Sequence, residues 1–341
     1  MRSVSVGVSV ALALAAVLSS EAAVQAAPAQ RGNAGQQPSA AQASGVVAMS
    51  AISFSVSDLA RSVAFYRTAF GLEMFGATVP AASMNSAMAS LVSAGGAKYR
   101  QATFEVPHTG VVVRLMEFSG VERASHKPGL GDPGQVRPRF LVSNMEVALA
   151  SLKLAGADIV WSGGESGASK TPTQVVARDP DGYVIKIERE DDVRAVAVTD
   201  LTPVVGLHVE LTTADTARKL AFYKDVLGID LAAGAPGTTQ TGAGDLKRTA
   251  SGELGGANRL LDIVEYREAG HAAPARGRVA DPATGVVSFI VRDLDAALNA
   301  ARQAKLRVVT AGEAPVSLAY AQARRIVVQD PDGAYVEMVE P

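Results

Sequence analysis

Imidazole, carboxylate and cationic side chains are the candidates for site chemistry in this 341-residue chain, which contains no cysteine. That absence excludes disulfides, thiolate metal sites, iron–sulfur clusters and a cysteine nucleophile. The four histidines are His108, His126, His208 and His271. Glycine or proline stands near His108, His126 and His271, which is typical of surface segments. His208 alone lies within an apolar run, so it is the histidine to be judged as a candidate site residue.

The overall composition is that of a globular protein without a nucleic-acid-binding surface. The chain has 32 Lys+Arg against 34 Asp+Glu, and a formal net charge of -2 excludes a broad basic surface for nucleic acid. At roughly 100–200 residues per domain, the length predicts two domains. A hydrophobic fraction of 48% is enough for globular cores.

The first 45 residues are predicted to be an export signal and a tether. Arg2 precedes an apolar run from Val4 to Leu18, and small residues follow up to Ala26. This order is typical of a secretory signal peptide over residues 1–26, and the run is shorter than the ~20 residues of a membrane-spanning helix. An uncleaved anchor is the alternative. Residues 27–45 hold almost nothing that could pack, which predicts a flexible linker. We therefore expect an exported protein, periplasmic or secreted.

The remaining sequence repeats itself. Residues 60–71 (ARSVAFYRTAFG) recur as residues 217–228 (ARKLAFYKDVLG), and residues 179–188 (DPDGYVIKIE) resemble residues 330–340 (DPDGAYVEMVE). The folded part therefore consists of two related halves.

Each half divides again into two similar units. Residues 52–56 alternate apolar with small or polar side chains, as a half-buried strand does, and Asp58 stands at the N-cap of a helix that ends at Gly71. Apolar runs typical of further strands follow the helix. The same order recurs at residues 140–142 with cap Asn144, 207–211 with cap Asp215, and 287–291 with a helix from Asp293. Four strand–helix–strand units with helices on one face of a sheet indicate an α+β fold.

At this level of detail the sequence resembles the vicinal-oxygen-chelate superfamily, which includes glyoxalase I, extradiol dioxygenases, and fosfomycin- and bleomycin-resistance proteins. The resemblance rests on SDLARSVAFYRTAFGLE, ADTARKLAFYKDVLGID and the DPDG turn that closes each half. It implies four βαβββ modules that form two glyoxalase-like domains with cup-shaped sheets. The domains would span residues 46–190 and 204–341, with a linker at 191–203.

The resemblance also implies where metal ligands would stand. In the superfamily, a residue on the first strand and one on the last strand of each module usually hold the metal. Register from the helix motif and the DPDG turn places Ala51, Arg114, Arg137 and Lys186 there in the first half. None of these offers a lone pair at neutral pH, so this set binds no divalent metal. One hypothesis is that Arg114, Arg137 and Lys186 bind an anionic ligand, such as a carboxylate or phosphate.

Internal salt bridges are the alternative for this cationic row. Strand alternation places Arg139 on the face of Arg137, and Glu188 on the face of Lys186, so carboxylates could neutralise the cations. Residues 78–98 are rich in small residues. They form either a flap over this cup or a plain surface insertion.

The second half carries a better set of metal ligands. The corresponding positions are His208, Asp262, Val286 and Glu337. One imidazole and two carboxylates could hold Mn²⁺, Fe²⁺, Ni²⁺ or Zn²⁺ and leave a position open for substrate. Glu337, or Asp262, would then serve as the catalytic group that moves a proton. Val286 removes the fourth ligand, and Asp262 is one methylene shorter than the usual glutamate.

Two functions remain open on this basis. The first is an exported protein that binds a small polar molecule, anionic if the cations of the first half contact it, with degenerate metal positions and no cofactor. The second is a metal-dependent lyase, isomerase or dioxygenase-like enzyme that works in the second domain. We expect no nucleic-acid partner, and no membrane partner after signal cleavage. The sequence leaves open whether the cups form within one chain or between the chains of a homodimer.

Overall fold

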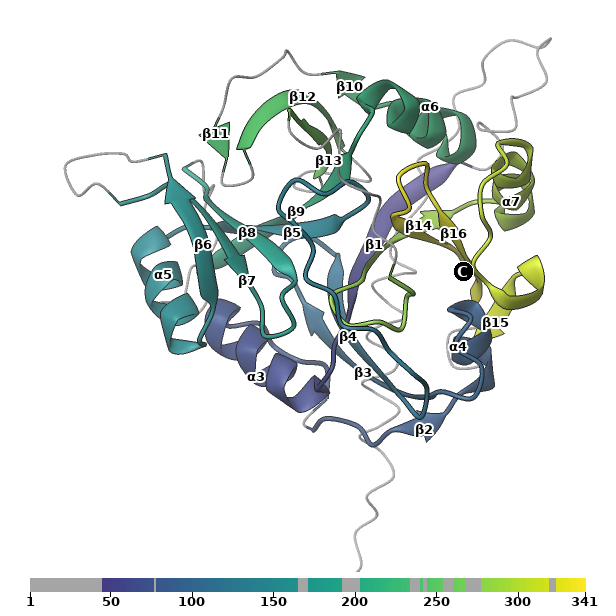
Figure 1. The fold of residues 1–341 in the computed structure, drawn as a ribbon, viewed down its shortest axis with the longest axis horizontal. Coiled ribbons are helices and arrows are strands. Elements are labelled where there is room, and N and C mark those ends of the chain that lie inside the picture. The colour runs from purple at the N-terminus through teal and green to yellow at the C-terminus, as the bar shows by residue number, and fades with distance from the viewer. Residues whose placement is uncertain are drawn as a thin grey trace, which may run out of the picture.

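The computed structural model describes residues 45–76, 78–164, 171–191, 203–233, 240–241, 244–253, 260–267, 277–318 and 323–341 (Figure 1). The predicted signal peptide, almost all of the linker at 27–45 and most of the linker at 191–203 lie outside these residues. Among the described helices, none is both long and apolar enough to cross a bilayer.

Four modules follow one another along the chain, each with a first strand, a helix and further strands. Module 1 comprises β1 (Val46–Ser55), α3 (Leu59–Phe70), β2 (Ser83–Met84), α4 (Ser86–Leu91), β3 (Lys98–Glu105) and β4 (Val112–Ser119). Module 2 comprises β5 (Val136–Val142), α5 (Met145–Leu154), β6 (Asp158–Gly163), β7 (Gln174–Arg178) and β8 (Val184–Arg189). Module 3 comprises β9 (Val204–Thr213), α6 (Thr216–Leu227), β10 (Ala232–Ala233), β11 (Gln240–Thr241), β12 (Gly244–Glu253) and β13 (Leu260–Tyr266). Module 4 comprises β14 (Gly285–Val291), α7 (Leu294–Gln303), the 3₁₀ turn η2 (Ala311–Glu313), β15 (Val316–Leu318), β16 (Ala323–Gln329) and β17 (Tyr335–Glu340).

The predicted helix caps are confirmed. Asp58 accepts a hydrogen bond from the backbone of Arg61, and Asp215 accepts one from Arg218. Asn144 and Asp293 cap α5 and α7 in the same way. Gly71 and Gly228 end α3 and α6 with φ of 63° and 68°, a left-handed backbone that favours glycine.

Two sheets form the framework, and each draws its strands from both halves of the chain (Figure 1). Among the described residues, the eight-stranded sheet has the order β15-β16-β17-β14-β1-β4-β3-β2 and joins modules 1 and 4. The nine-stranded sheet has the order β10-β12-β13-β9-β5-β8-β7-β6, with β11 paired to β12, and joins modules 2 and 3. We call them the 1–4 sheet and the 2–3 sheet. At the centre of each, two first strands pair antiparallel: β1 with β14, and β5 with β9.

This pairing confirms one expectation and corrects another. The α+β class, the four modules and the cup-shaped sheets are as predicted. The grouping of candidate residues into one cup per half is wrong, because the first strand of each module forms hydrogen bonds with a first strand of the other half. Both cups are therefore built within one chain, but each combines one module from each half.

Alternation along the strands gives each sheet two distinct faces. On one face Phe54, Leu115, Phe140 and Leu207 are buried in the large apolar core, which the helices cover. We call this the core face, and the opposite face of each sheet the cup face. Residues of the cup face stand one position away from core residues, as Arg114 does beside Leu115.

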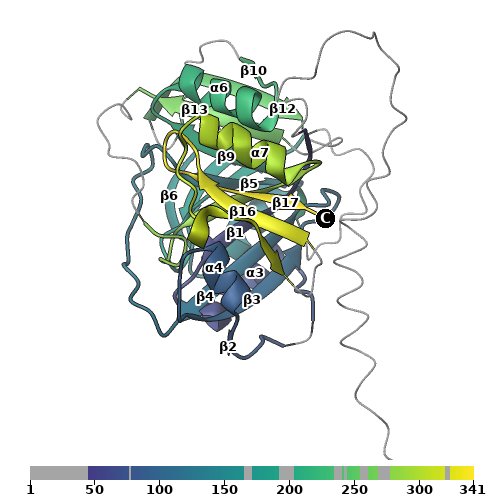
Figure 2. The ribbon, with the colours of Figure 1, turned by 90° about the vertical axis from the view of Figure 1, so that its right-hand side faces the viewer.

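The helices pair within each half, in contrast to the strands. Helix α3 packs against α5, and α6 packs against α7. Figure 2 shows α6 and α7 side by side. Modules of one half are therefore joined through their helices, which leaves their first strands free to pair across halves.

The DPDG turns strengthen the joint between modules of the same half. Asp181, in the turn of module 2, accepts hydrogen bonds at the start of α3 from the backbone of Ser57 (3.2 Å) and from Arg61 (2.9 Å). Asp179 accepts hydrogen bonds from the backbone N–H groups of Asp181 (2.9 Å) and Tyr183 (2.8 Å). Burial raises the pKa of Asp179 to about 7.

The corresponding joint in the second half contains a buried lysine. The Nζ of Lys219, on α6, lies 2.9 Å from Asp330 and 3.3 Å from Asp332, and donates a hydrogen bond to the carbonyl of Thr212 at 2.8 Å. Lys219 is fully buried, whereas module 1 carries Ser62 at the equivalent position. Burial raises the pKa of Asp330 although the Lys219 ammonium opposes the shift.

Lys219→Ser, which installs the residue of module 1, tests this joint. Two buried carboxylates would lose their shared cation, so we expect the free energy of unfolding to fall by about 3–5 kcal/mol in urea titrations. The matched control is Lys224→Ala on the same helix, whose ion pair with Asp230 is exposed and should contribute less than about 1 kcal/mol. Equal effects of the two substitutions would contradict the assignment.

Candidate functional site

The cup face of the 1–4 sheet carries a buried cluster around Glu337. Arg114 on β4 and Arg325 on β16 each place a guanidinium nitrogen 3.3 Å from its carboxylate, and Ser288 on β14 donates a hydrogen bond at 2.5 Å. Burial alone would raise the pKa of Glu337, but Arg325 and Arg114 hold it below its usual range. Glu337 is therefore a carboxylate whose oxygens are engaged by its own protein.

The rest of this cup is filled with apolar side chains. Helix α4 contacts β3, β15 and β16, and Asn85 caps it through a hydrogen bond from the backbone of Met88. Of the two alternatives for residues 78–98, the structure therefore shows a segment packed over the 1–4 cup. The buried cluster consists of Met88, Leu91, Val92, Ala94, Ala97, Tyr99, Met116, Phe118, Val279, Ala280, Val286, Val309, Leu318, Val327 and Tyr335.

The cup face of the 2–3 sheet is polar at its centre. Register places Arg137 on β5 opposite Glu210 on β9, and their side chains approach to 3.3 Å. Lys186 on β8 lies 2.5 Å from the other oxygen of Glu210 and 2.9 Å from the hydroxyl of Tyr266. Burial alone would raise the pKa of Glu210, but Lys186 and Arg137 hold it below its usual range.

Arg137 is almost wholly satisfied by the protein. Its side chain is 1% exposed and donates hydrogen bonds to Gln135 at 2.9 and 3.1 Å and to the backbone carbonyls of Gly129 and Leu130. The side chain of Lys186 is 12% exposed. The contacts of Arg137 and Lys186 match the alternative in which these cations form internal salt bridges, and Glu210 supplies the carboxylate.

Arg139 lies at the centre of a second polar group in the same cup. One terminal nitrogen, NH2, lies 2.7 Å from Nδ1 of His208 and donates a hydrogen bond to Asp262 on β13. The other, NH1, lies 3.4 Å from Glu188 on β8. Ser251 donates to the second oxygen of Asp262 at 2.6 Å. One guanidinium thus contacts side chains from three neighbouring strands.

The contact with Arg139 determines the state of His208. Arginine can only donate hydrogen bonds, so Nδ1 carries the lone pair and a neutral ring carries its proton on Nε2. Burial, and then the charge of Arg139, lower the pKa of His208 to about 3. His208 is therefore a neutral hydrogen-bonding residue over the physiological pH range.

A cleft of about 280 Å³ opens on this cup face. Arg139, Lys186 and Glu188 reach it with their side chains, and Trp161 of the outer strand β6 stands at its side. The remaining lining residues are Gln174, Val175, Val176, Ile187, Glu210, Thr249, Ser251, Asp262 and Val264.

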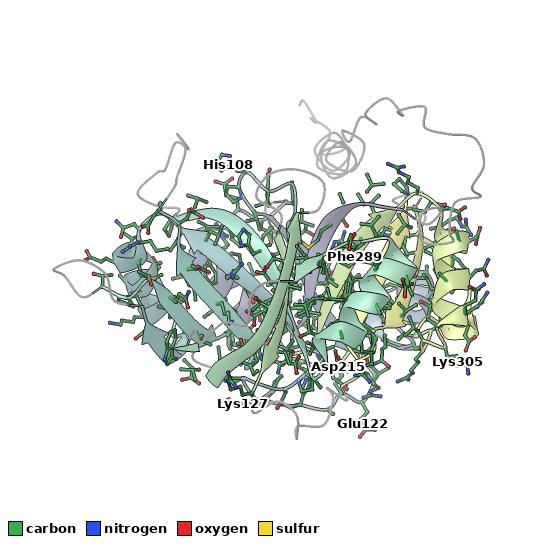
Figure 3. The ribbon with its side chains drawn as sticks, turned by 90° about the horizontal axis from the view of Figure 1, so that it is seen from above. His108, Glu122, Lys127, Asp215, Phe289 and Lys305 are labelled. Atoms are coloured by element: carbon green, nitrogen blue, oxygen red, sulfur yellow. The ribbon has the colours of Figure 1, made fainter. Side chains whose placement is uncertain are left out.

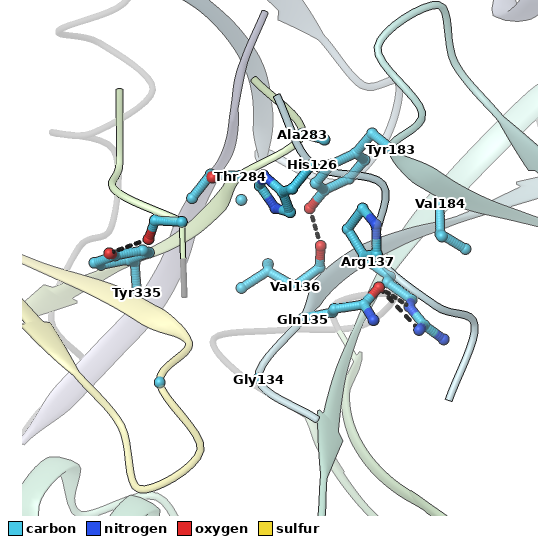
Figure 4. Close-up of a pocket in the computed structure, with 14 residues that line it drawn as sticks. His126, Gly134, Gln135, Val136, Arg137, Tyr183, Val184, Ala283, Thr284 and Tyr335 are labelled. Atoms are coloured by element: carbon cyan, nitrogen blue, oxygen red, sulfur yellow. Dashed lines mark hydrogen bonds between the residues drawn. The ribbon is translucent and has the colours of Figure 1, made fainter. Parts of the chain in front are cut away.

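A much smaller cavity of about 20 Å³ lies where the two halves meet (Figure 4). Tyr183 donates there to the carbonyl of Val136, and Tyr335 donates to that of Gly277 at 2.5 Å. A side chain at Gly285 would lie only 2.2 Å from the Tyr183 hydroxyl. This cavity is part of the packed joint between halves, and it holds His126. His108 is exposed at the edge of the molecule (Figure 3), and His271 lies outside the described residues.

The sequence matches the Glyoxalase/Bleomycin resistance protein/Dioxygenase superfamily over residues 48–187 and 207–338. The chain belongs to this superfamily. Glyoxalase I from Zea mays is similar in structure, with 19% identity and a TM-score of 0.56 over 86% of this chain and 92% of that chain. A putative dioxygenase from Bacillus subtilis has 13% identity and a TM-score of 0.53 over 87% of this chain and 86% of that chain. The comparison with curated protein sequences returned no match. These structural likenesses concern the fold alone.

The metal ligands that the superfamily resemblance implied are not brought together. His208 and Asp262 lie in the 2–3 cup, whereas Glu337 lies in the 1–4 cup, because β17 pairs with β14 and not with β9. Arg139 engages both His208 and Asp262. Within the described ranges, no three histidine, aspartate or glutamate side chains form a group that could hold a metal ion. The residues present therefore do not fit the divalent metal.

The expected anion-binding set is divided as well. Arg137 and Lys186 lie together in the 2–3 cup, but Arg114 lies in the 1–4 cup, paired with Glu337. The sequence reasoning missed Glu210 and Trp161. Glu210 follows His208 by two positions, so strand alternation alone places it on the same face.

The state of His208 has a consequence for stability against acid. In the unfolded chain the ring takes up a proton near pH 6.5, whereas in the fold it stays neutral to about pH 3. The unfolded state therefore binds more protons in this window, and the free energy of unfolding falls as pH falls from about 6.5 to about 3. The slope from one histidine is at most ~1.4 kcal/mol per pH unit.

His208→Asn should remove the part of the pH dependence of the free energy of unfolding that comes from His208. An amide oxygen can still accept a hydrogen bond from Arg139, but it does not titrate. Urea unfolding at several pH values between 7.5 and 4 measures it, and the variant should lose less stability on acidification than the wild type. His108→Asn, at an exposed site, is the control and should leave the slope unchanged. Parallel curves for wild type and His208→Asn would show that His208 does not stay neutral in the fold.

Proposed function

We propose that this protein binds a small polar molecule in the cleft of the 2–3 cup, without a metal ion. The cleft of about 280 Å³ with mixed polar and apolar walls is the observation that carries this proposal. The 1–4 cup offers a contrast, because α4 and an apolar cluster fill it. Concave sites with a few converging polar groups are the usual form of ligand sites.

The lining indicates what such a molecule would carry. Val176, Ile187 and Val264 provide apolar wall, and Trp161 provides a flat aromatic surface. Arg139 has donors left for the ligand, since the contact of NH1 within the described part of the chain is the ion pair with Glu188 at 3.4 Å. The ligand would therefore combine a ring or apolar portion with an oxygen that accepts from Arg139.

Charge balance limits how anionic the ligand would be. Arg137, Arg139 and Lys186 face the carboxylates of Glu188, Glu210 and Asp262 in this cup. Among the described side chains, three positive charges are thus matched by three negative ones, and a strongly anionic ligand would gain little net attraction. We expect a ligand with little net charge. The alternative, a metal-dependent enzyme with Glu337 as catalytic group, loses its main support because Glu337 lies in the other cup.

Trp161 allows a direct test, because it is the only tryptophan of the chain. Benzamide and benzoate have nearly the same shape but differ in charge, and glucose is polar without an aromatic ring. We expect millimolar benzamide to change the fluorescence of Trp161, and to bind at least as tightly as benzoate. Arg139→Ala should weaken benzamide binding by about 10–100-fold, the loss of a hydrogen bond to a charged donor.

Arg189→Ala is the matched control, since Arg189 lies on the same strand as Lys186 but pairs with Asp191 outside the cleft. It should leave the titration unchanged. A fragment screen in which no compound alters Trp161 emission or the melting temperature would reject the proposal, as would equal effects of the two arginine substitutions.

We also propose that the protein is exported by its first 26 residues. The support is the order of Arg2, the apolar run and the small residues that end at Ala26. Expression of the full chain in a bacterial host should yield a product outside the cytoplasm whose N-terminal residue is Ala27. Deletion of residues 2–26 should retain the protein in the cytoplasm, and an unprocessed membrane-bound product would favour the uncleaved anchor.

A further inference from the structure

We propose that the cleft of the 2–3 cup selects molecules that carry an amide group, with a carbonyl oxygen and an N–H side by side, on an aromatic ring. The inference rests on the function proposed above and names the chemical class of its ligand. Arg139 donates a hydrogen bond to the carbonyl oxygen, and the carboxylate of Glu188 accepts one from the N–H. Trp161 contacts the ring.

Among the described side chains of the cleft, Arg139 and Glu188 form the ion pair that leaves most hydrogen-bonding capacity for a ligand. The other two carboxylates of the cleft, Glu210 and Asp262, accept from side chains of the protein on both of their oxygens. The Glu188 side chain is 32% exposed, and its ion-pair partner within the described part of the chain is NH1 of Arg139 at 3.4 Å. That distance exceeds the about 2.7–2.9 Å of a charge-assisted hydrogen bond. A ligand can therefore offer each group a shorter contact than they make with one another.

An amide is the neutral group that satisfies both members of this pair. A guanidinium only donates hydrogen bonds and a carboxylate only accepts them, so a donor and an acceptor stand side by side at the wall of the cleft. A carboxylate ligand would be repelled by Glu188, and an ammonium ligand by Arg139. A ketone or an ether would answer Arg139 and leave Glu188 without a donor. An amide presents an acceptor and a donor on adjacent atoms and carries no net charge.

The register of the strands places the aromatic wall in line with this pair. Trp161 on β6 lies opposite Val176 on β7, and Val176 lies opposite Lys186 on β8. Lys186 in turn lies opposite Arg139 on β5. Paired residues share a face of the sheet, and three strand spacings of ~4.8 Å put the backbones of Trp161 and Arg139 ~14 Å apart. Both side chains line the cleft, and the short Val176 between them leaves room for a flat ring.

Benzamide and acetophenone test the assignment directly, because a methyl group in acetophenone replaces the amide NH₂ and the carbonyl oxygen and the ring are unchanged. Benzyl alcohol adds a ligand with donor and acceptor on a single oxygen. Ligand-observed NMR titrations of the wild-type protein give the three dissociation constants. We expect benzamide to bind about 10–100-fold more tightly than acetophenone, the contribution of a hydrogen bond to a charged group. Benzyl alcohol should bind more weakly than benzamide.

Two variants separate the two halves of the amide contact. Glu188→Ala should weaken benzamide by about 10–100-fold and leave acetophenone bound no more weakly than by the wild type. Arg139→Ala should weaken both compounds, because both lose the donor to their carbonyl oxygen. Arg189→Ala is the matched control on β8, since Arg189 pairs with Asp191 and does not line the cleft, and it should leave both affinities unchanged. Circular dichroism reports whether each variant folds, and Glu188→Met is the substitute if the alanine variant does not.

The outcomes distinguish a failure of this inference from a failure of the proposed function. Benzamide and acetophenone that bind the wild type equally tightly would leave the cleft as a ligand site and overturn its preference for amides. So would benzyl alcohol that binds as tightly as benzamide, or an advantage of benzamide that persists in Glu188→Ala. Absence of binding by all three compounds would count against the cleft as a ligand site, and the inference would fall with it.

Discussion

The antiparallel pairing of first strands across the two halves is the constraint on which the rest of this structure depends. In β1–β14 and β5–β9, backbone groups of one half complete the hydrogen bonding of the other, and these strands lie at the centre of their sheets. All ten residues of β9 are buried, and β9 is a central strand that pairs with β5 on one side and β13 on the other. The register of these pairs places Arg137 opposite Glu210 and Arg139 opposite His208, so the chemistry of the 2–3 cup follows from it.

Desolvation explains why the polar cup is held so fully by its own residues. Arg137 and Glu210 are nearly inaccessible to water, and an isolated charge there would cost several kcal/mol. The cup avoids this cost because each cation contacts a carboxylate and the remaining donors reach neutral acceptors such as Gln135. His208 follows the same rule in its neutral form. A polar network of this kind is rigid, and rigidity prepares a binding site before its ligand arrives.

Local features of the fold were predictable from the sequence, whereas the pairing of modules was not. Caps such as Asp58 and Asp215 and the left-handed Gly71 act within a few residues, so their types and spacing locate the helices. The partner of β1 is chosen through backbone hydrogen bonds, which all four first strands can make, and nothing in the residue types distinguishes β14 from β5. The individual site positions were therefore found, but their grouping was not. Trp161 gave no signal because it stands on an outer strand beyond any repeat motif.

The two cups show what a duplicated module can become once its parts are free to diverge. In the 1–4 cup, Arg114 and Arg325 enclose Glu337, and the insertion with α4 adds the apolar cluster that fills the concave face. In the 2–3 cup, the polar network lies beneath a cleft. Both cups neutralise their buried carboxylates with arginine, so charge balance alone does not make a site. Among the described residues, the difference is that apolar side chains fill the 1–4 cup, whereas in the 2–3 cup a cleft lets a ligand reach the charges that the strands have aligned.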